Sequence, residues 1–267
     1  MNPDPNALEA TLQAGAAEVQ RLTAELAQLR SEYQDFVYTV SHDLRAPLRH
    51  ISAFTQVIAE DLVNAPPDIL AHLGTIRQSA LLLTQQLDGL LALSRLGQQP
   101  LRLQPVPVVE LLHAAARECA LRYPKKAVQW QLAPDVPPLW ADAELVRQLL
   151  DQLLDNAVKF SGAAALVAVS WQAVAVGQAS QPECCEITVR DSGVGFAPAQ
   201  ASKLFKVFAK LHPAREYGGL GMGLVSCLKI VQRLGGSIAI AAEVNASCCV
   251  TLRLPLAAPA GHQTCCA

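Results

Sequence analysis

The segment FVYTVSHDLRAPL, residues 36–48, places His42 next to Asp43 on what the surrounding pattern predicts to be a long helix. From Val19 to Val40 the apolar residues alternate in steps of three and four, which is the spacing of a coiled-coil seam. With Val40 in the seam, His42 points away from it into water. Asp43 can then hydrogen-bond one ring nitrogen, fix the tautomer and leave the other nitrogen nucleophilic. Taken alone, however, the segment fits an ordinary solvated histidine on a helix face better than it fits a nucleophilic histidine.

The helix that carries this segment is expected to run from residue 6 to about 63. Gly15 interrupts its seam and should weaken the helix there, and Pro47 should bend it. A turn at 64–68, with Asp68 as helix cap, leads to a second helix that ends near Leu96. Such a hairpin cannot bury its apolar stripe alone, so we predict a homodimer that forms a four-helix bundle. The seam residues are Leu8, Leu12, Val19, Leu22, Leu26, Leu29, Tyr33, Phe36 and Val40.

The composition narrows the functional classes. The 267 residues carry a net charge of −2, which gives no argument for binding nucleic acid or an anionic membrane. Because no apolar run reaches the length of a spanning helix and the chain does not start like a signal peptide, we expect a cytoplasmic protein with no membrane span in this chain. Of the eight cysteines, six form adjacent pairs without zinc-site spacing, so we expect buried or free thiols.

After a linker at 98–107, the pattern changes to alternating helices and strands. The predicted helices span 108–123, 143–160 and 222–234, the second with Asp142 as its cap. The predicted strands span 128–132, 165–176, 186–190, 237–244 and 248–254. A loop region at 191–221 precedes the last helix. The expected fold is therefore a helical hairpin followed by an α/β two-layer sandwich, with helices on one face of a sheet.

One group of polar residues in this second part lies on a predicted helix. Gln152, Asn156 and Lys159 are spaced at i, i+4 and i+7, so they share one face. An amide oxygen on that face suits Mg²⁺, which prefers oxygen ligands together with phosphates, and Lys159 can neutralise phosphate charge. The polar outer face of an ordinary amphipathic helix would show the same pattern.

Two further groups contain glycines. Asp191 ends a predicted strand and is followed by Gly193 and Gly195, so its carboxylate could accept a hydrogen bond from adenine N6 while the glycines allow close approach to the ring. An ordinary Asp-Ser-Gly turn would look similar. The loop at 218–224 directly precedes a helix, where free backbone N–H groups can bind an anion. It lacks the Rossmann and P-loop spacings.

Together, these segments resemble the histidine-kinase family of two-component signalling. The histidine segment is similar to the family's phosphoacceptor box, and four more boxes follow in the family's order within residues 35–256. They are the N box DNAVKF (155–160), the first glycine box DSGVGF (191–196), the F box LFKVF (204–208) and the second glycine box GLGMGL (219–224). The histidine box, together with Lys210-Leu211-His212, looks most like the phytochrome-type branch.

The resemblance implies four parts and a tail. A coiled coil at 1–34 would precede a dimerisation and phosphotransfer domain at 35–97. After the linker, an ATP-binding domain at 108–258 would have the fold shared with gyrase and heat-shock chaperone ATPases (Bergerat/GHKL), followed by a tail at 259–267. His42 would attack the γ-phosphoryl of ATP, with Asp43 as base or ring orienter. The phosphoryl group would then pass to a response-regulator receiver domain.

The resemblance also implies roles at the nucleotide site. Asn156 would hold Mg²⁺ with Gln152 beside it, and Asp191 would recognise adenine. Lys159, Arg215 and the glycine loop would hold phosphates, while residues 197–217 would form a lid docked by two phenylalanines. The implied nucleotide-binding residues are Gln152, Asn156, Lys159, Asp191, Gly193, Gly195, Phe205, Phe208, Arg215, Gly219, Gly221, Gly223 and Leu224.

Two departures from the family pattern and two alternatives stay open. Ala46 stands where many members carry Thr or Asn to orient water, so weak phosphatase activity is expected. Leu220 stands where Thr or Ser is usual, so altered ATP affinity is expected. A dimeric ATP-binding scaffold without kinase activity is the main alternative; an ATP-driven clamp would leave His42 unexplained. A sensor domain is expected on a separate partner or in a missing N-terminal part.

Overall fold

The chain forms two compact units, Met1–Ser94 and Arg95–Ala267, in a computed structural model. The structure describes the backbone of residues 5–62, 66–174, 184–212 and 214–256, and the side chains in these ranges except 5–13, 30, 214 and 215. Outside the described part therefore lie the side chains of the seam residues Leu8 and Leu12, residues 64 and 65 of the predicted turn, and the tail at 259–267.

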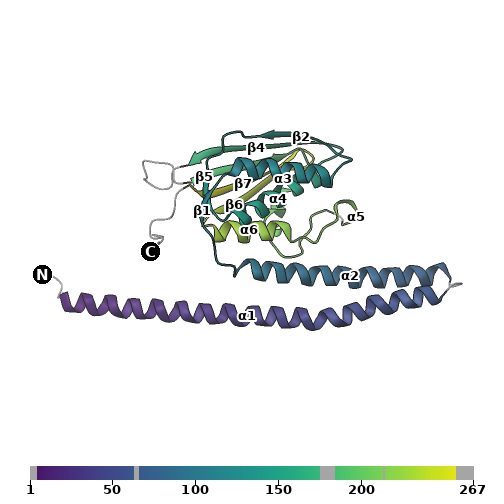
Figure 1. Cartoon of the computed structure of the whole chain (residues 1–267), viewed down its shortest axis with the longest axis horizontal. Helices are drawn as coiled ribbons and strands as arrows, with labels where there is room; N and C mark the ends of the chain where they lie inside the picture. Colours follow the sequence, from purple (N-terminus) through teal and green to yellow (C-terminus); the bar gives the residue numbers. More distant parts are fainter. Residues whose placement is uncertain (1–4, 63–65, 175–183, 213, 257–267) are drawn as a thin grey trace. The chain divides into compact units, whose positions relative to one another are not determined.

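The first unit is the predicted helical hairpin. Helix α1 (Pro5–Asp61) runs without interruption through Pro47, and α2 (Pro67–Leu96) follows it (Figure 1). Asp68 lies in the first turn of α2 and not at its cap, because Pro67, with its fixed φ and missing N–H, is the first helical residue. Within the described ranges, no helix is long and apolar enough to cross a membrane.

The seam side chains of α1 that the structure describes are exposed in the single chain. Their exposed fractions run from 37% for Val40 to 68% for Tyr33. An ion pair from Arg45 Nη2 to Asp88 Oδ1, at 2.7 Å, joins α1 to α2. Apolar side chains exposed at heptad spacing can pack against a partner helix, and their burial there would stabilise the pair.

The second unit is built on a five-stranded sheet in the order β2-β4-β5-β7-β6. The pairing of β2 with β4 is parallel, and the other neighbours are antiparallel. Helices α3, α4 and α6 pack on one face (Figure 1). This arrangement confirms the predicted two-layer α/β sandwich. The strands are β2 (Ala127–Leu132), β4 (Ala164–Val174), β5 (Cys184–Asp191), β6 (Ser237–Glu243) and β7 (Ser247–Pro255).

Helix α4 (Ala143–Lys159) is the central element of the core, between α3 (Val108–Arg122) and α6 (Gly223–Arg233). As predicted, Asp142 caps it, since its Oδ1 accepts from the backbone N–H of Glu144 and Leu145. Its leucines at 149, 150, 153 and 154 are at most 2% exposed, and each contributes roughly 2 kcal/mol through burial. The opposite face stays polar and lies against a cavity.

Two predictions about connecting segments need correction. The linker at 98–107 contains strand β1 (Gln104–Val106), which pairs with β3 (Leu139–Ala141) in a separate two-stranded sheet. The loop at 191–221 contains a 3₁₀ helix, η1 (Pro198–Lys203), and α5 (Ala214–Tyr217). These elements have three to six residues each, which is too short for a hydrophobic period to show in the sequence.

Candidate nucleotide site

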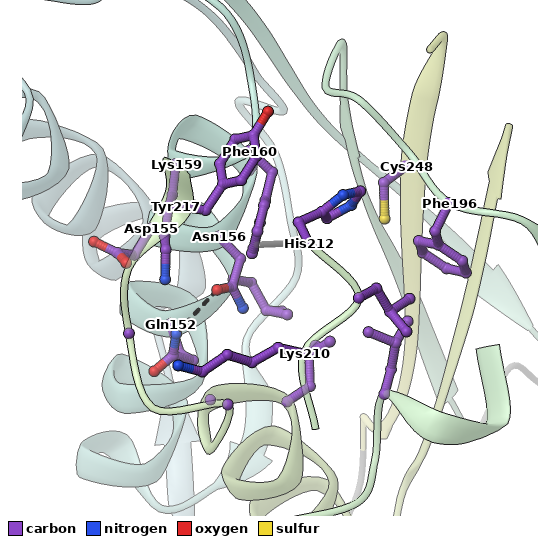
Figure 2. Close-up of a pocket in the computed structure, with 18 of the residues that line it drawn as sticks. Gln152, Asp155, Asn156, Lys159, Phe160, Phe196, Lys210, His212, Tyr217 and Cys248 are labelled. Atoms are coloured by element: carbon purple, nitrogen blue, oxygen red, sulfur yellow. Dashed lines mark hydrogen bonds between the residues drawn. The ribbon is translucent and has the colours of Figure 1, made fainter. Parts of the chain in front are cut away.

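A cavity of about 360 Å³ opens between the polar face of α4, the end of β5 and the segment before α6 (Figure 2). It brings together residues from all three predicted groups, although they are up to 72 positions apart in the chain. Nine of the implied nucleotide-binding residues line it: Gln152, Asn156, Lys159, Asp191, Gly195, Gly219, Gly221, Gly223 and Leu224. The cavity is closed at the sheet and open at the glycine loop, where Gly218 and Gly219 are exposed.

The closed end holds the Asp191 carboxylate, which is only 7% exposed. Its Oδ1 accepts from the Gly193 N–H at 2.8 Å. Burial raises the pKa of Asp191 to about 6, against the lowering effect of hydrogen bonds from the backbone of Gly193 and Cys248. A buried acid next to apolar walls is suited to accept a hydrogen bond from a ligand N–H group.

The turn after Asp191 is tightly enclosed. A Cβ on Gly193 would lie 2.9 Å from the Phe160 carbonyl oxygen, so Gly193 supports the turn but does not itself line the cavity. Gly195 has φ +55, and a Cβ there would overlap the carbonyl of Glu243. Only glycine fits these two positions without moving backbone.

On α4, Gln152, Asn156 and Lys159 all line the cavity, as expected for residues that share one helix face. Gln152 Nε2 donates to Asn156 Oδ1 at 3.4 Å, and both amides face the cavity (Figure 2). Lys159 projects from the same face, and burial lowers the pKa of its ammonium group. A Cβ on Gly219 would lie 2.5 Å from Lys159 Nζ, so the ammonium lies directly beside the glycine loop.

The glycine loop needs its glycines for two reasons. Gly219 and Gly221 have φ of +82 and +74, a region that other residues rarely adopt. A Cβ on Gly221 would also lie 2.6 Å from the carbonyl oxygen of Ala209 and 2.8 Å from the carbonyl carbon of Phe208. The loop therefore packs backbone against backbone on the end of the F box.

Besides Gly193, three predicted site residues are not among the described residues that line the cavity. Phe205 and Phe208 are half-buried beside it, and Phe208 has a positive φ of 62. Their neighbours Leu204 and Ala209 line the cavity instead. The backbone of Arg215 lies in α5, and its side chain is outside the described residues.

Sequence reasoning missed several lining residues that lie near the ends of helices and strands or in the segments between them. Phe160, His212 and Tyr217 form a cluster of rings in the wall of the cavity, and Cys248 also lines it (Figure 2). Lys210 reaches across the cavity toward Gln152 (Figure 2). The only sequence signal was the Lys210-Leu211-His212 tripeptide, which resembled a branch of the family without indicating a contact.

In the first unit, His42 is as exposed as predicted. Its side chain is 68% exposed and that of Asp43 71%, with Nδ1 and Oδ1 3.2 Å apart. Because the carboxylate can only accept while ionised, Nδ1 carries the proton in this contact and Nε2 keeps its lone pair. The arrangement leaves one nucleophilic nitrogen facing solvent.

Two protein-family models match the chain, one over the segment that contains His42 and the other over the segment that contains the cavity. Residues 32–99 match the model of the His Kinase A (phospho-acceptor) domain. Residues 141–258 match the model described as histidine kinase-, DNA gyrase B-, and HSP90-like ATPase. The first range includes His42, and the second includes every residue that lines the cavity.

Several known proteins are similar to this chain over most of its length. The chain is 32% identical over 247 residues to the methanogenesis regulatory histidine kinase FilI of Methanothrix harundinacea, covering 92% of this chain and 27% of FilI. It is 29% identical to cyanobacterial phytochrome B of Nostoc sp., covering 84% of this chain and 29% of that protein. It is 28% identical to the histidine-protein kinase BaeS of Escherichia coli, covering 90% of this chain and 50% of BaeS. The chain thus spans between about a quarter and a half of these relatives.

Among solved structures, full-length ShkA in complex with AMPPNP superposes with a TM-score of 0.58 at 24% identity, covering 84% of this chain and 46% of ShkA. The histidine kinase AdeS of Acinetobacter baumannii gives a TM-score of 0.51 at 21% identity, covering 81% of this chain and 98% of the AdeS chain. At these identities the likeness concerns the fold.

Proposed function

Because the chain belongs to the sensor histidine kinases of two-component systems, we propose that it phosphorylates its own His42 from ATP and passes the phosphoryl group to a response regulator. The acceptor there is an aspartate of the receiver domain. The observation that carries this proposal is the polarity of the cavity. A buried carboxylate, Asp191, lies at its closed end, and the Lys159 ammonium with the glycine loop lies at its open end.

This polarity suits ATP bound in one orientation. The adenine N6 amine donates to Asp191, and the triphosphate extends toward Lys159 and the backbone N–H groups of the glycine loop. Lys210 adds a second positive charge at the same end. The reverse orientation would bring phosphate charge against a buried carboxylate and is excluded on electrostatic grounds.

In the phosphoryl transfer, the lone pair of His42 Nε2 forms a bond to the γ-phosphorus. The bond between that phosphorus and the β–γ bridging oxygen breaks, and ADP leaves with its electron pair. The positive charge that develops on the ring is shared with Asp43 through the Nδ1 proton. In the second step, a receiver aspartate oxygen attacks the phosphorus and the imidazole leaves.

The residues present fit a magnesium ion that is held mainly by phosphates. Within the described ranges, no three acidic, histidine or cysteine side chains gather as a metal site. Asn156 instead offers one amide oxygen facing the cavity, with Gln152 beside it. Mg²⁺ takes few protein ligands where substrate phosphates supply the others. When bound there, it neutralises phosphate charge.

We also propose that the chain acts as a homodimer through the exposed seam of α1, which in a single chain leaves Phe36 and Tyr33 more than 60% exposed. Pairing two copies would bury this seam in a coiled coil and a four-helix bundle. A separate or additional sensor domain is proposed as the source of the signal. A cytoplasmic location stays a prediction from the sequence.

The test is incubation of the chain with γ-labelled ATP and Mg²⁺, followed by chemical stability of the label. We expect acid-labile, base-stable label that disappears in His42→Ala, while ADP binding of this variant is unchanged. If the wild type binds ATP without acquiring label, the scaffold interpretation replaces the kinase. If label persists in His42→Ala, the acceptor is another residue.

A further inference from the structure

His212 makes a contact that the proposed reaction does not use. Its Nε2 lies 3.0 Å from the carbonyl oxygen of Gly195. Since a carbonyl oxygen only accepts, Nε2 must carry a proton and donate. The ring is half-buried at the wall of the cavity. The contact joins the segment at 204–212, which includes the F box and Lys210, to the turn that follows Asp191.

The same imidazole belongs to a cluster of three rings. Its centroid lies 5.7 Å from that of Phe160 and 5.4 Å from that of Tyr217, and those two rings are 5.1 Å apart. The tilts of 36° to 56° are within the range that aromatic pairs favour. His212 is therefore held by a hydrogen bond at its edge and by packing on its surface (Figure 2).

The carbonyl that His212 binds is itself rigidly placed. Val194, next to Gly195, donates its N–H to the Phe160 carbonyl at 3.1 Å and accepts from the Asn245 N–H at 2.8 Å. The turn is thus tied both to the end of α4 and to the hairpin between β6 and β7. A side chain that binds this turn is therefore attached to a part of the cavity wall that backbone hydrogen bonds hold from two sides.

The segment at 204–212 is also held at a second place, by close packing of its backbone. At Phe208 and Ala209 its backbone packs closely against Gly221 of the glycine loop. Lys210 lies between this anchor and His212, and its side chain extends over the cavity toward Gln152 (Figure 2). The position of the Lys210 ammonium therefore depends on both anchors.

We infer that His212 is a positioning residue for the phosphoryl transfer proposed above: it latches the segment at 204–212 to the Asp191 turn and so holds Lys210 over the triphosphate. The inference rests on the proposed function for its kinetic consequence. Loss of the latch leaves the contacts of Asp191 with adenine intact. It loosens only the side of the cavity where the γ-phosphoryl group lies.

Three substitutions of His212 in the full chain separate the effect of its hydrogen bond to Gly195 from the effect of its packing on Phe160 and Tyr217. His212→Gln keeps an N–H donor near the position of Nε2, His212→Phe keeps a ring, and His212→Ala removes both. His113→Ala is the matched control, because His113 is an exposed histidine on α3 of the same unit. Tryptophan fluorescence unfolding checks that each variant folds.

The kinetic readouts are kcat and KM for labelling of His42. We expect kcat to fall about five- to fiftyfold in His212→Ala, from the loss of one hydrogen bond and of aromatic packing, with KM for ATP changed less than threefold. His212→Gln and His212→Phe should each recover part of kcat. Equal falls in all four variants, or a change confined to KM, would overturn the inference.

The second readout does not need kinase activity. Trypsin cleavage after the exposed Lys203, Lys206 and Lys210 should be slowed by the ATP analogue AMPPNP in the wild type and in His113→Ala, but not in His212→Ala. Equal protection in His212→Ala would overturn the latch. If wild-type protein binds nucleotide without labelling His42, the proposed function fails, and the trypsin comparison still decides the role of His212.

Discussion

Replacing Asp191 by Asn should stabilise the nucleotide-free protein at neutral pH and weaken nucleotide binding at the same time. The carboxylate is 7% exposed, and burial raises its pKa to about 6 from the ordinary 3.8. An acid whose pKa is higher in the folded than in the unfolded protein binds more protons when folded. The free energy of unfolding of the wild type should therefore fall as the pH rises from about 4 to about 6, and level off above.

The size of this effect follows from the two pKa values. A rise from 3.8 to about 6 corresponds to about 3 kcal/mol of lost stability at pH 7 and above. Asparagine has nearly the same shape and no charge to bury, so Asp191→Asn should avoid this loss. At pH 4, where the wild-type carboxyl is largely protonated, the two proteins should be about equally stable.

Tryptophan fluorescence during urea unfolding measures this directly. The chain has three tryptophans, Trp130, Trp140 and Trp171, and all three lie in the second unit. Their signal therefore reports the unit that contains Asp191 without interference from the helical hairpin. Unfolding curves at half-unit steps from pH 4 to pH 8 would give the free energy of unfolding of both proteins.

The affinity of ADP should change in the opposite direction. The variant loses a hydrogen bond to a charged acceptor, which corresponds to about ten- to a hundredfold weaker binding at pH 8. Parallel stability curves for the two proteins, or a variant that is less stable at every pH, would refute the reasoning about the buried carboxylate. Unchanged ADP affinity would refute the assignment of Asp191 to the base.

Four further substitutions test other parts of the site. Lys159→Met should weaken ATP binding about ten- to a hundredfold and ADP binding less, as measured by calorimetry, because the ammonium lies beside the glycine loop. Gly221→Ala should lower the midpoint of thermal unfolding and abolish ATP binding, because its Cβ would overlap the backbone at Ala209 and φ is +74. Leu220→Thr should change ATP affinity by less than tenfold in a nucleotide titration; a wild type that binds no ATP would contradict this. Ala46→Thr should accelerate dephosphorylation of a phosphorylated receiver domain, which the wild type should catalyse slowly.

The elements that the sequence predicted well share a physical reason. Helix α4 follows from a 3.6-residue period and a capping Asp142, and the long strands follow from alternation. In each case the local pattern and the tertiary environment agree. Strands β1 and β3, by contrast, have three residues each, and Pro105 in β1 argues against a strand by itself. Their pairing depends on two segments that are distant in the chain.

The residues of the site likewise fall into those that the sequence could group and those that it could not. Gln152, Asn156 and Lys159 could be grouped from the sequence because a single helix fixes their spacing. Their meeting with Asp191 and the glycine loop was implied only by the family resemblance. The cluster of Phe160, His212 and Tyr217 could not be predicted, because it joins the end of α4 to an irregular segment at His212 and to α5, which has only four residues. No periodic pattern specifies either of these two segments.

The two ends of the cavity also explain why the donor and the acceptor can belong to separate units. Asp191 is buried, so the adenine end is closed to any macromolecule. Gly219 and Lys210 are exposed, so the γ-phosphoryl end faces outward. His42 is likewise two-thirds exposed, with its reactive nitrogen free. Phosphoryl transfer requires that the phosphate end of the bound nucleotide and the imidazole both be reachable from solvent, and a receiver domain can reach the same nitrogen afterwards.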